Sequence, residues 1–160
     1  YLGAYLNEGF DSPLLFKLER ELRERLPNMF AEHRLAQMWA FKGGGQCPGT
    51  RLHADKSYIN LNFWITPDAA LRDPASGGLR VFDVAAPPEW QFENYNHQEA
   101  AMRAEIKRQG GSGQDVFYKC NRGMIFDASL MHETIALDFH PGYENHRINI
   151  TMLFGDRSES

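Results

Sequence analysis

Two segments of the chain alternate between apolar and polar residues, and their polar positions carry almost no charge. The segments are residues 58–65, which read YINLNFWI, and residues 147–154, which read RINITMLF. Side chains of a β-strand point alternately to opposite faces, so each segment has one apolar and one polar face. A strand face in water usually carries lysine and glutamate, whereas these carry amides, a hydroxyl, a phenol and one arginine. We therefore expect two strands whose apolar faces bury against a helix and whose polar faces line a cavity.

The two polar faces supply most of the side chains with which such a cavity could bind a ligand. Their members are Tyr58, Asn60, Asn62, Trp64, Arg147, Asn149, Thr151 and Leu153. The simpler alternative is a sheet with one face in water, an arrangement that is common in antiparallel sheets. The cavity is favoured because a solvated strand face usually carries more lysine and glutamate.

Short segments of strand-like composition follow one another through most of the chain, separated by glycine, proline, aspartate and asparagine. They are residues 35–42, 50–55, 57–65, 78–84, 115–120, 123–127, 130–137 and 146–154. Many short strands at such spacing are typical of sandwiches and barrels. We therefore predict a mainly β fold with flanking helices, in which two sheets form a jelly roll around the polar cavity.

Two further segments break this pattern and are expected to be helical. Residues 12–26 begin with Ser12 as the N-cap and Pro13 in the first helical position. Leucine then recurs at every fourth residue, which predicts one apolar stripe made of Leu14, Leu18, Leu22 and Leu26. Residues 89–109 form a helical insert that follows two prolines and ends in a glycine-rich segment.

Length and composition limit the class of protein. The 160 residues have the usual length of one domain, so we expect a single domain over residues 1–160. The formal net charge of −4 gives no general attraction to nucleic acid, and no apolar run approaches the roughly 20 residues of a membrane span. We expect neither as a partner. Two cysteines indicate reduced thiols and a cytoplasmic location, although targeting cannot be read from a chain that begins with tyrosine.

Three residues have the chemistry and spacing of a metal site. In a strand, His53 and Asp55 would project from the same face, where an imidazole and a carboxylate can bind one metal together. His132 lies between apolar segments, which makes it a candidate third ligand. Two histidines and one carboxylate form the facial triad of non-haem Fe(II) oxygenases. The alternatives are a surface histidine beside an acid for His53 and a hydrogen-bonded core histidine for His132.

Arg147 is the one charged residue on the polar face of the last strand. A buried arginine is costly unless it meets an anion, and its planar guanidinium binds a carboxylate through two parallel hydrogen bonds. A carboxylate co-substrate that also chelates the metal would satisfy both the arginine and the open metal positions. The alternative is a structural ion pair with an acid, of which Asp55, Asp83 and Asp127 are examples.

The order His53-x-Asp55, His132, Arg147 on a predicted jelly roll resembles the Fe(II)/2-oxoglutarate-dependent dioxygenase superfamily. Three stretches are similar to its prolyl-hydroxylase-like and phytanoyl-CoA-hydroxylase-like members: HADKSYINLNFWITPD, SGGLRVFDV and NRGMIFDASLMHETIALDFHPGYENHRINITMLFG. The resemblance covers roughly residues 35–155. It implies a double-stranded β-helix, a cupin-like barrel, as the core of a single oxygenase domain.

The resemblance also implies roles for individual residues. His53, Asp55 and His132 would bind Fe(II), and Arg147 would bind the distal carboxylate of 2-oxoglutarate. Hydroxyl and amide side chains commonly assist in this family, and the candidates here are Thr151, Asn149, Asn60 and Tyr58. The implied activity is that of a hydroxylase that uses O2 and couples oxidative decarboxylation of 2-oxoglutarate to hydroxylation of a substrate.

Two other functions are compatible with the same pattern. A cupin-like metalloenzyme would use the barrel without a keto acid, and it gives Arg147 no obvious role. A non-catalytic jelly-roll binding module would keep the fold without oxygen-dependent turnover. The sequence leaves the primary substrate open between a small molecule and a protein side chain, because fold and metal site do not choose between them.

Overall fold

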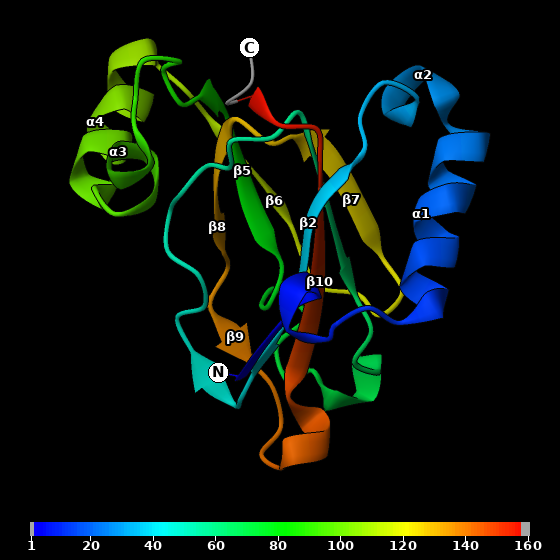
Figure 1. Ribbon diagram of the computed structural model, residues 1–160. Helices are drawn as coiled ribbons and strands as arrows, with labels where there is room; N and C mark the ends of the chain where they lie inside the picture. The colour runs from blue at the N-terminus through cyan, green and yellow to red at the C-terminus, as the bar shows by residue number, and fades with distance from the viewer. Residues whose placement is uncertain (1, 158–160) are drawn as a thin grey trace.

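Two β-sheets face one another in the computed structural model, which describes residues 2–157 of the chain (Figure 1). The larger sheet has five strands in the order β1-β2-β10-β4-β7, and each neighbouring pair is antiparallel. Its strands are β1 (Leu2–Tyr5), β2 (Leu35–Gly43), β10 (Arg147–Phe154), β4 (Ile59–Trp64) and β7 (Gly123–Asp127). Strand β10 therefore lies in the middle of the sheet although it is the last strand of the chain.

The smaller sheet has three strands in the order β6-β5-β8, and a two-stranded ribbon pairs β3 with β9. These strands are β6 (Gly113–Val116), β5 (Leu79–Ala85), β8 (Leu130–Thr134), β3 (Gln46–Cys47) and β9 (Leu137–Asp138). Short 3-10 helices lie at η1 (Leu6–Glu8), η2 (Asp68–Ala70) and η3 (Tyr143–Asn145). The predicted mainly β jelly roll is confirmed.

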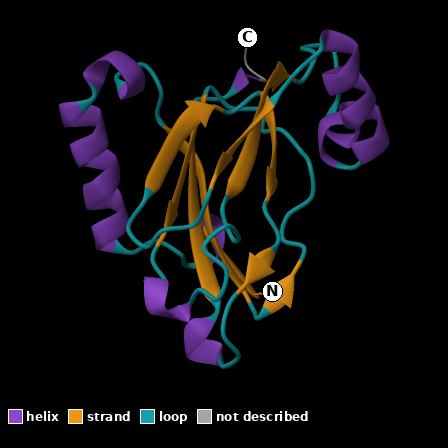
Figure 2. Cartoon of the chain, turned by 180° about the vertical axis from the view of Figure 1, so that it is seen from behind, coloured by secondary structure: helices purple, strands orange, loops and turns teal. Residues whose placement is uncertain are grey.

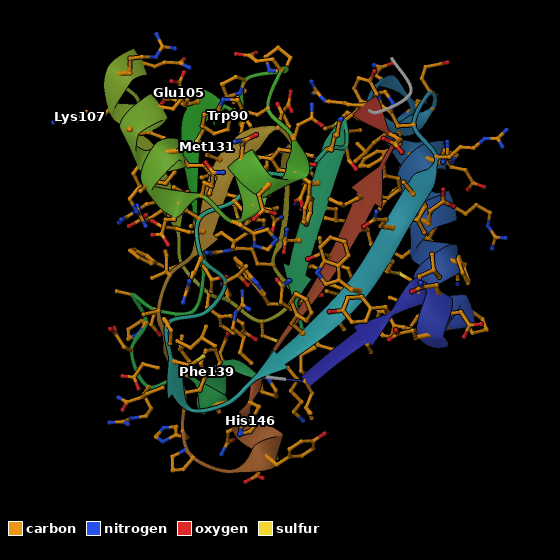
Figure 3. All side chains as sticks on the ribbon, turned by 60° about the vertical axis from the view of Figure 1, so that its left-hand side comes forward. Trp90, Glu105, Lys107, Met131, Phe139 and His146 are labelled. Carbon is orange, nitrogen blue, oxygen red and sulfur yellow. The ribbon has the colours of Figure 1, made fainter. Side chains whose placement is uncertain are left out.

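Helices cover the outer faces of the two sheets rather than the space between them (Figure 2). Helices α1 (Pro13–Arg25) and α2 (Pro27–Phe30) lie beside the larger sheet. Helices α3 (Phe92–Asn96) and α4 (Glu99–Gln109) lie on the other side, and α4 buries Met102 and Ile106 against Val84 of β5 and Met131 of β8. Figure 3 shows Met131 beside these helices and His146 at the opposite end of the molecule.

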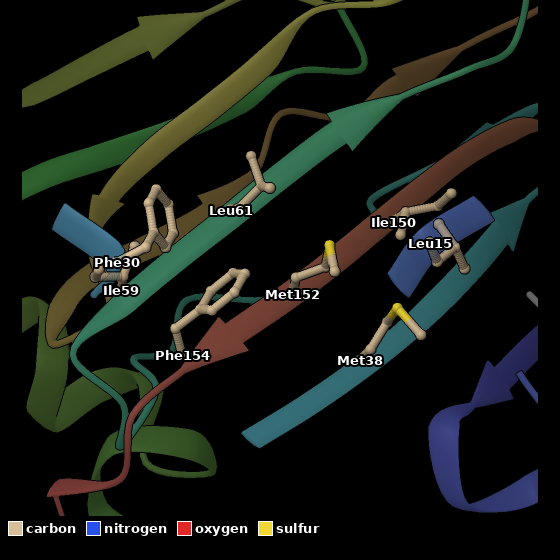
Figure 4. Close-up of a cluster of buried hydrophobic side chains, with 8 residues drawn as sticks. All are labelled: Leu15, Phe30, Met38, Ile59, Leu61, Ile150, Met152 and Phe154. Carbon is tan, nitrogen blue, oxygen red and sulfur yellow. The ribbon is translucent and has the colours of Figure 1, made fainter. Parts of the chain in front are cut away.

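The main apolar core lies between the larger sheet and helices α1 and α2 (Figure 4). The buried members are Leu15, Phe30, Met38, Ile59, Leu61, Ile150, Met152 and Phe154. The members that lie in strands come from alternate positions, as the period of two predicted, and Leu15 and Phe30 come from α1 and α2. The opposite positions of β4 and β10 point between the sheets, so the polar faces line an interior cavity and their side chains are buried.

The first predicted helix forms, but its buried face differs from the predicted one. Ser12 caps it and Pro13 begins it. Leu14 is 72% exposed and Leu26 39% exposed, whereas Leu15 is 8% exposed and packs on the sheet. The face that packs thus runs through Leu15 and the half-buried Leu18 and Leu22. Leu14 and Leu15 both lie about one turn before Leu18, on either side of the line through Leu18 and Leu22. The sheet contacts the side of the helix that carries Leu15, so Leu14 faces water.

Several predicted strand limits are also corrected. Residues 50–55 form no strand: they carry one isolated bridge, His53 to His132, because their other backbone N–H groups bond to separate segments. The predicted strand 115–120 is β6, which ends at Val116, and the predicted strand 130–137 divides into β8 and β9. Strands β1 and β3 were not expected. The predicted insert 89–109 is the helix pair α3 and α4. Within residues 2–157, no helix is both long and apolar enough to cross a membrane.

The two adjacent leucines of α1 give a direct test of this packing. We expect Leu15→Ala to lower the free energy of unfolding by about 2–4 kcal/mol, because it leaves a cavity under the sheet. Leu14→Ala is the matched control and should change it by less than about 0.5 kcal/mol, since that side chain lies in water. Urea denaturation of both variants measures the difference. Equal losses would contradict the packing described above.

Candidate metal centre

His53, Asp55 and His132 come together at one end of the cavity. His132 lies in β8, and the irregular segment that precedes β4 carries the other two. Two backbone hydrogen bonds join the segments, from His53 N–H to His132 O (3.0 Å) and from His132 N–H to His53 O (2.8 Å). One ligand atom from each residue lies within 4.8 Å of the others, and His132 Nε2 is 3.5 Å from Asp55 Oδ2. The structure thus brings the three predicted ligands together.

Both imidazoles are held in the orientation that a metal ligand needs. His53 Nδ1 lies 2.7 Å from the carbonyl oxygen of Arg51, and His132 Nδ1 lies 2.8 Å from that of Leu130. A carbonyl oxygen only accepts, so each Nδ1 carries the proton and donates it. Each Nε2 therefore keeps its lone pair for a metal.

The charge state of His132 also suits metal binding. The ring is 2% exposed, and burial lowers the pKa of His132 to about 4, with the neighbouring His53 acting in the same direction. Asp55 and the hydrogen bond to Leu130 oppose that shift. The imidazole is therefore neutral at ordinary pH, and a metal would not have to displace a proton from it. Two imidazoles and a carboxylate form the donor set of a facial iron site.

A one-way chain of hydrogen bonds leads from β10 to the Asp55 carboxylate. Asn149 Nδ2 donates to Thr151 Oγ1 (2.9 Å), and Thr151 Oγ1 donates to Asn62 Oδ1 (3.0 Å). Asn62 Nδ2 then donates to Asn60 Oδ1, and Asn60 Nδ2 donates to Asp55 Oδ2 (2.8 Å). We call these four side chains, Asn149, Thr151, Asn62 and Asn60, the polar relay. It gives each of the four side chains at least one hydrogen-bond partner and holds one oxygen of the Asp55 carboxylate.

Arg147 begins β10, and its cavity-facing guanidinium lacks an anionic partner. The residue is 5% exposed, its Nε donates to Gly77 O (2.5 Å), and its Nη2 has no hydrogen-bond partner. The guanidinium carbon lies 5.6 Å from the centre of the Trp64 ring. Burial lowers the pKa of Arg147 to about 10, which still leaves the group charged at neutral pH. A buried cation in this state needs an anion.

The alternative of a structural ion pair does not hold for Arg147. Among residues 2–157 no carboxylate lies within 4 Å of its guanidinium nitrogens, and the three candidate acids contact other groups. Asp127 pairs with Arg157, Asp83 accepts hydrogen bonds from Ser112, and Asp55 accepts from Asn60. The free Nη2 therefore remains available to a ligand.

One cavity contains all of these groups. It encloses about 640 Å³ of space, including its mouth, and its lining includes the three ligand residues, Arg147 and the polar relay. Of the four predicted assisting residues, the structure places Asn60, Asn149 and Thr151 in this cavity. Tyr58 lies elsewhere, stacked on His33 at 4.5 Å in a bend before β4 begins. Asn62 was not among the predicted candidates, although it occupies the same strand face as Asn60.

The cavity mouth holds residues that the sequence analysis missed. Trp39 and Phe41 of β2 line the cavity, as do Cys47 and Thr50 of the following segment. Trp39 pairs with Thr151 and Phe41 with Asn149, so they share the inward face of the sheet. The alternation within residues 35–42 was the available signal for these two aromatic residues.

Comparisons with known proteins place this arrangement in a recognisable fold. No protein-family model matches the chain, and no curated protein is similar to it in sequence. Among solved structures, AviO1 from Streptomyces viridochromogenes Tue57 matches 96% of this chain and 66% of its own, at a TM-score of 0.63 and 16% identity. HygX from Streptomyces hygroscopicus with iron bound matches 91% of this chain and 68% of its own, at a TM-score of 0.54 and 16% identity.

HygX has also been solved with nickel and 2-oxoglutarate bound, and that structure matches at a TM-score of 0.54 and 15% identity. A third similar structure, EvdMO1, is matched over 35% of its length. The chain shares its jelly-roll fold with these structures. The likeness predicted from the sequence is thus confirmed at the level of the fold, whereas the site rests on the geometry described above.

The polar relay predicts that Asn60 supports metal binding without touching the metal. We expect Asn60→Ala to weaken Ni(II) binding by about 10–100-fold, because the Asp55 carboxylate loses the group that orients it. Asn28→Ala, at an exposed position of α2, is the matched control and should bind as the parent does. Isothermal titration calorimetry with Ni(II) measures both. Unchanged affinity in a folded Asn60→Ala variant would show that the relay does not position Asp55.

Proposed function

We propose that this chain is a non-haem iron oxygenase domain that couples oxidative decarboxylation of 2-oxoglutarate to hydroxylation of a second substrate. The observation that carries the proposal is the unpaired Arg147 guanidinium in the same cavity as His53, Asp55 and His132. A metal triad alone fits many reactions. A triad with a buried cation in the same cavity specifies a ligand that chelates the metal and carries a second, distant anion.

2-Oxoglutarate has this chemistry, because its 2-oxo acid end can chelate a metal and its other carboxylate can bind arginine. The chain would hold Fe(II) through His53, Asp55 and His132, and Arg147 would hold the distal carboxylate through its free Nη2. Bound Fe(II) would supply the reaction of O2 with 2-oxoglutarate, which yields succinate, CO2 and a hydroxylated substrate. The likeness to HygX, solved with nickel and 2-oxoglutarate, supports this assignment.

The protein's own contribution is orientation and exclusion of water. The polar relay holds Asn60, Asn62, Thr151 and Asn149 in fixed orientations, because each donates one hydrogen bond to the next group along the chain. The two backbone-anchored imidazoles keep the Nε2 atoms directed to one point. Trp64, fully buried beside Arg147, makes the surroundings of the guanidinium apolar, which strengthens its attraction for a carboxylate. Thr151 and Asn149 stay candidates for direct contact with the co-substrate.

The primary substrate would enter beside Trp39 and Phe41 at the mouth of the cavity. A small molecule and a protein side chain both satisfy this arrangement. The cupin-like alternative leaves the unpaired Arg147 without a role. The non-catalytic alternative gives no role to the Nε2 atoms of His53 and His132, which are free to bind a metal.

An anaerobic titration with Fe(II) followed by 2-oxoglutarate tests the proposal. We expect the weak visible charge-transfer band of a chelated keto acid to appear in the parent protein. In Arg147→Met, 2-oxoglutarate affinity should fall by about 30-fold or more, because one partner of a buried charge pair is lost. Iron affinity should change little, since Arg147 does not touch the metal ligands.

Arg72→Met is the matched control, because Arg72 is 46% exposed and pairs with Asp138 outside the cavity. It should retain the band and the parent affinity. Iron binding without a band would favour the cupin-like enzyme. No iron binding by folded protein would favour the non-catalytic module.

A further inference from the structure

Cys47 places a thiol in the cavity beside the arginine. The residue ends β3 and is partly exposed, and it lines the same cavity as Arg147. Gly43 is the strand partner of Arg147, and a Cβ built on Gly43 would lie 3.9 Å from Cys47 Sγ. The thiol and the guanidinium therefore approach the same space from neighbouring backbone positions. Within residues 2–157, Cys47 Sγ has no hydrogen-bond partner.

Arg147 places a positive charge in the cavity that this thiol also lines. Arg147 is 5% exposed, and its Nη2 has no hydrogen-bond partner. Burial lowers the pKa of Arg147, and Tyr118 and Cys47 oppose that shift. The positive charge of Arg147 attracts an anionic reagent into the cavity.

Cys120 provides an internal comparison outside the cavity. It is also partly exposed, but its Sγ donates to Ile65 O at 3.6 Å. Its backbone N–H donates to the carboxylate of Asp68 at 2.6 Å, and Lys119 and Arg122 are its charged neighbours in the sequence, so charges of both signs lie near it. An anionic reagent should therefore be attracted to Cys47 more strongly than to Cys120, which has no buried unpaired cation among the described residues in contact with it.

We propose that Cys47 is a covalent modification site for small carboxylates that carry an electrophilic carbon, with Arg147 holding the carboxylate. With iodoacetate, Cys47 Sγ forms a bond to the CH2 carbon, the carbon–iodine bond breaks, iodide leaves with the electron pair, and the thiol proton passes to solvent. With an α,β-unsaturated carboxylate, Sγ bonds to the β-carbon and a proton ends on the α-carbon. Either product fills the space in front of Arg147. If the proposed function holds, modification therefore also excludes 2-oxoglutarate.

Iodoacetate and iodoacetamide test the proposal on metal-free protein, because they share a reactive carbon and leaving group and differ in charge. Peptide mass spectrometry gives the rate of labelling at each cysteine. We expect the ratio of iodoacetate rate to iodoacetamide rate to be about tenfold or more higher at Cys47 than at Cys120. In Arg147→Met this excess should disappear, while Cys120 labelling stays unchanged and reports an intact fold. Equal ratios at the two cysteines of the parent, or an excess that survives in Arg147→Met, would overturn the proposal.

A second measurement needs no variant and so does not depend on folding of Arg147→Met. Acetate offers a carboxylate without a leaving group, and at high concentration it should slow iodoacetate labelling of Cys47 and leave Cys120 unaffected. No slowing at Cys47 would overturn the proposal. Neither measurement uses iron or 2-oxoglutarate, so failure of the proposed function would leave these outcomes unchanged.

Discussion

Strand β10 is buried on both faces, and its two faces impose opposite requirements on the rest of the molecule. Ile150, Met152 and Phe154 need an apolar cover, which α1 and α2 supply together with the neighbouring strands. Thr151 needs a hydrogen-bond partner inside the molecule, and β4 supplies Asn62 at the register position beside it, while Asn149 donates to Thr151 within β10. The helical layer thus covers the apolar face of β10, and the polar cavity holds the hydrogen-bond partners of its other face.

The same strand sets the dimensions of the site. Arg147 and Thr151 are four residues apart, or about 13 Å along an extended chain. The covalent backbone therefore fixes how far the guanidinium lies from the middle of the polar relay. At the other end of the cavity, backbone hydrogen bonds between His53 and His132 hold the segment of His53 and Asp55 against β8, which carries the third candidate ligand. Arg147 and His132 thus lie in strands β10 and β8, whereas His53 and Asp55 lie in the irregular segment before β4 and are held there by backbone hydrogen bonds.

Much of this could be predicted from the sequence, because alternation is a local property. It assigns Asn60 and Thr151 to the inward face as soon as their strands are recognised. Tyr58 fails the same rule because it precedes the strand, where the chain bends and alternation no longer applies. Segment 50–55 has the composition of a strand, but its backbone hydrogen-bond partners come from several distant segments. A local sequence pattern carries no information about such partners. The choice of Leu15 over Leu14 likewise depends on how the helix rolls on the sheet.

The direction of the polar relay has a consequence of its own. Every amide and hydroxyl in it must point the same way, because the aspartate at its end can accept hydrogen bonds and cannot donate them. The side-chain dipoles from Asn149 to Asn60 are therefore locked as a single unit with one permitted polarity. An asparagine at position 55 would be nearly isosteric, yet it could donate, and the whole chain would then have two polarities of similar energy. The Asp55 carboxylate therefore fixes one direction for all the side-chain dipoles of the polar relay inside the jelly roll.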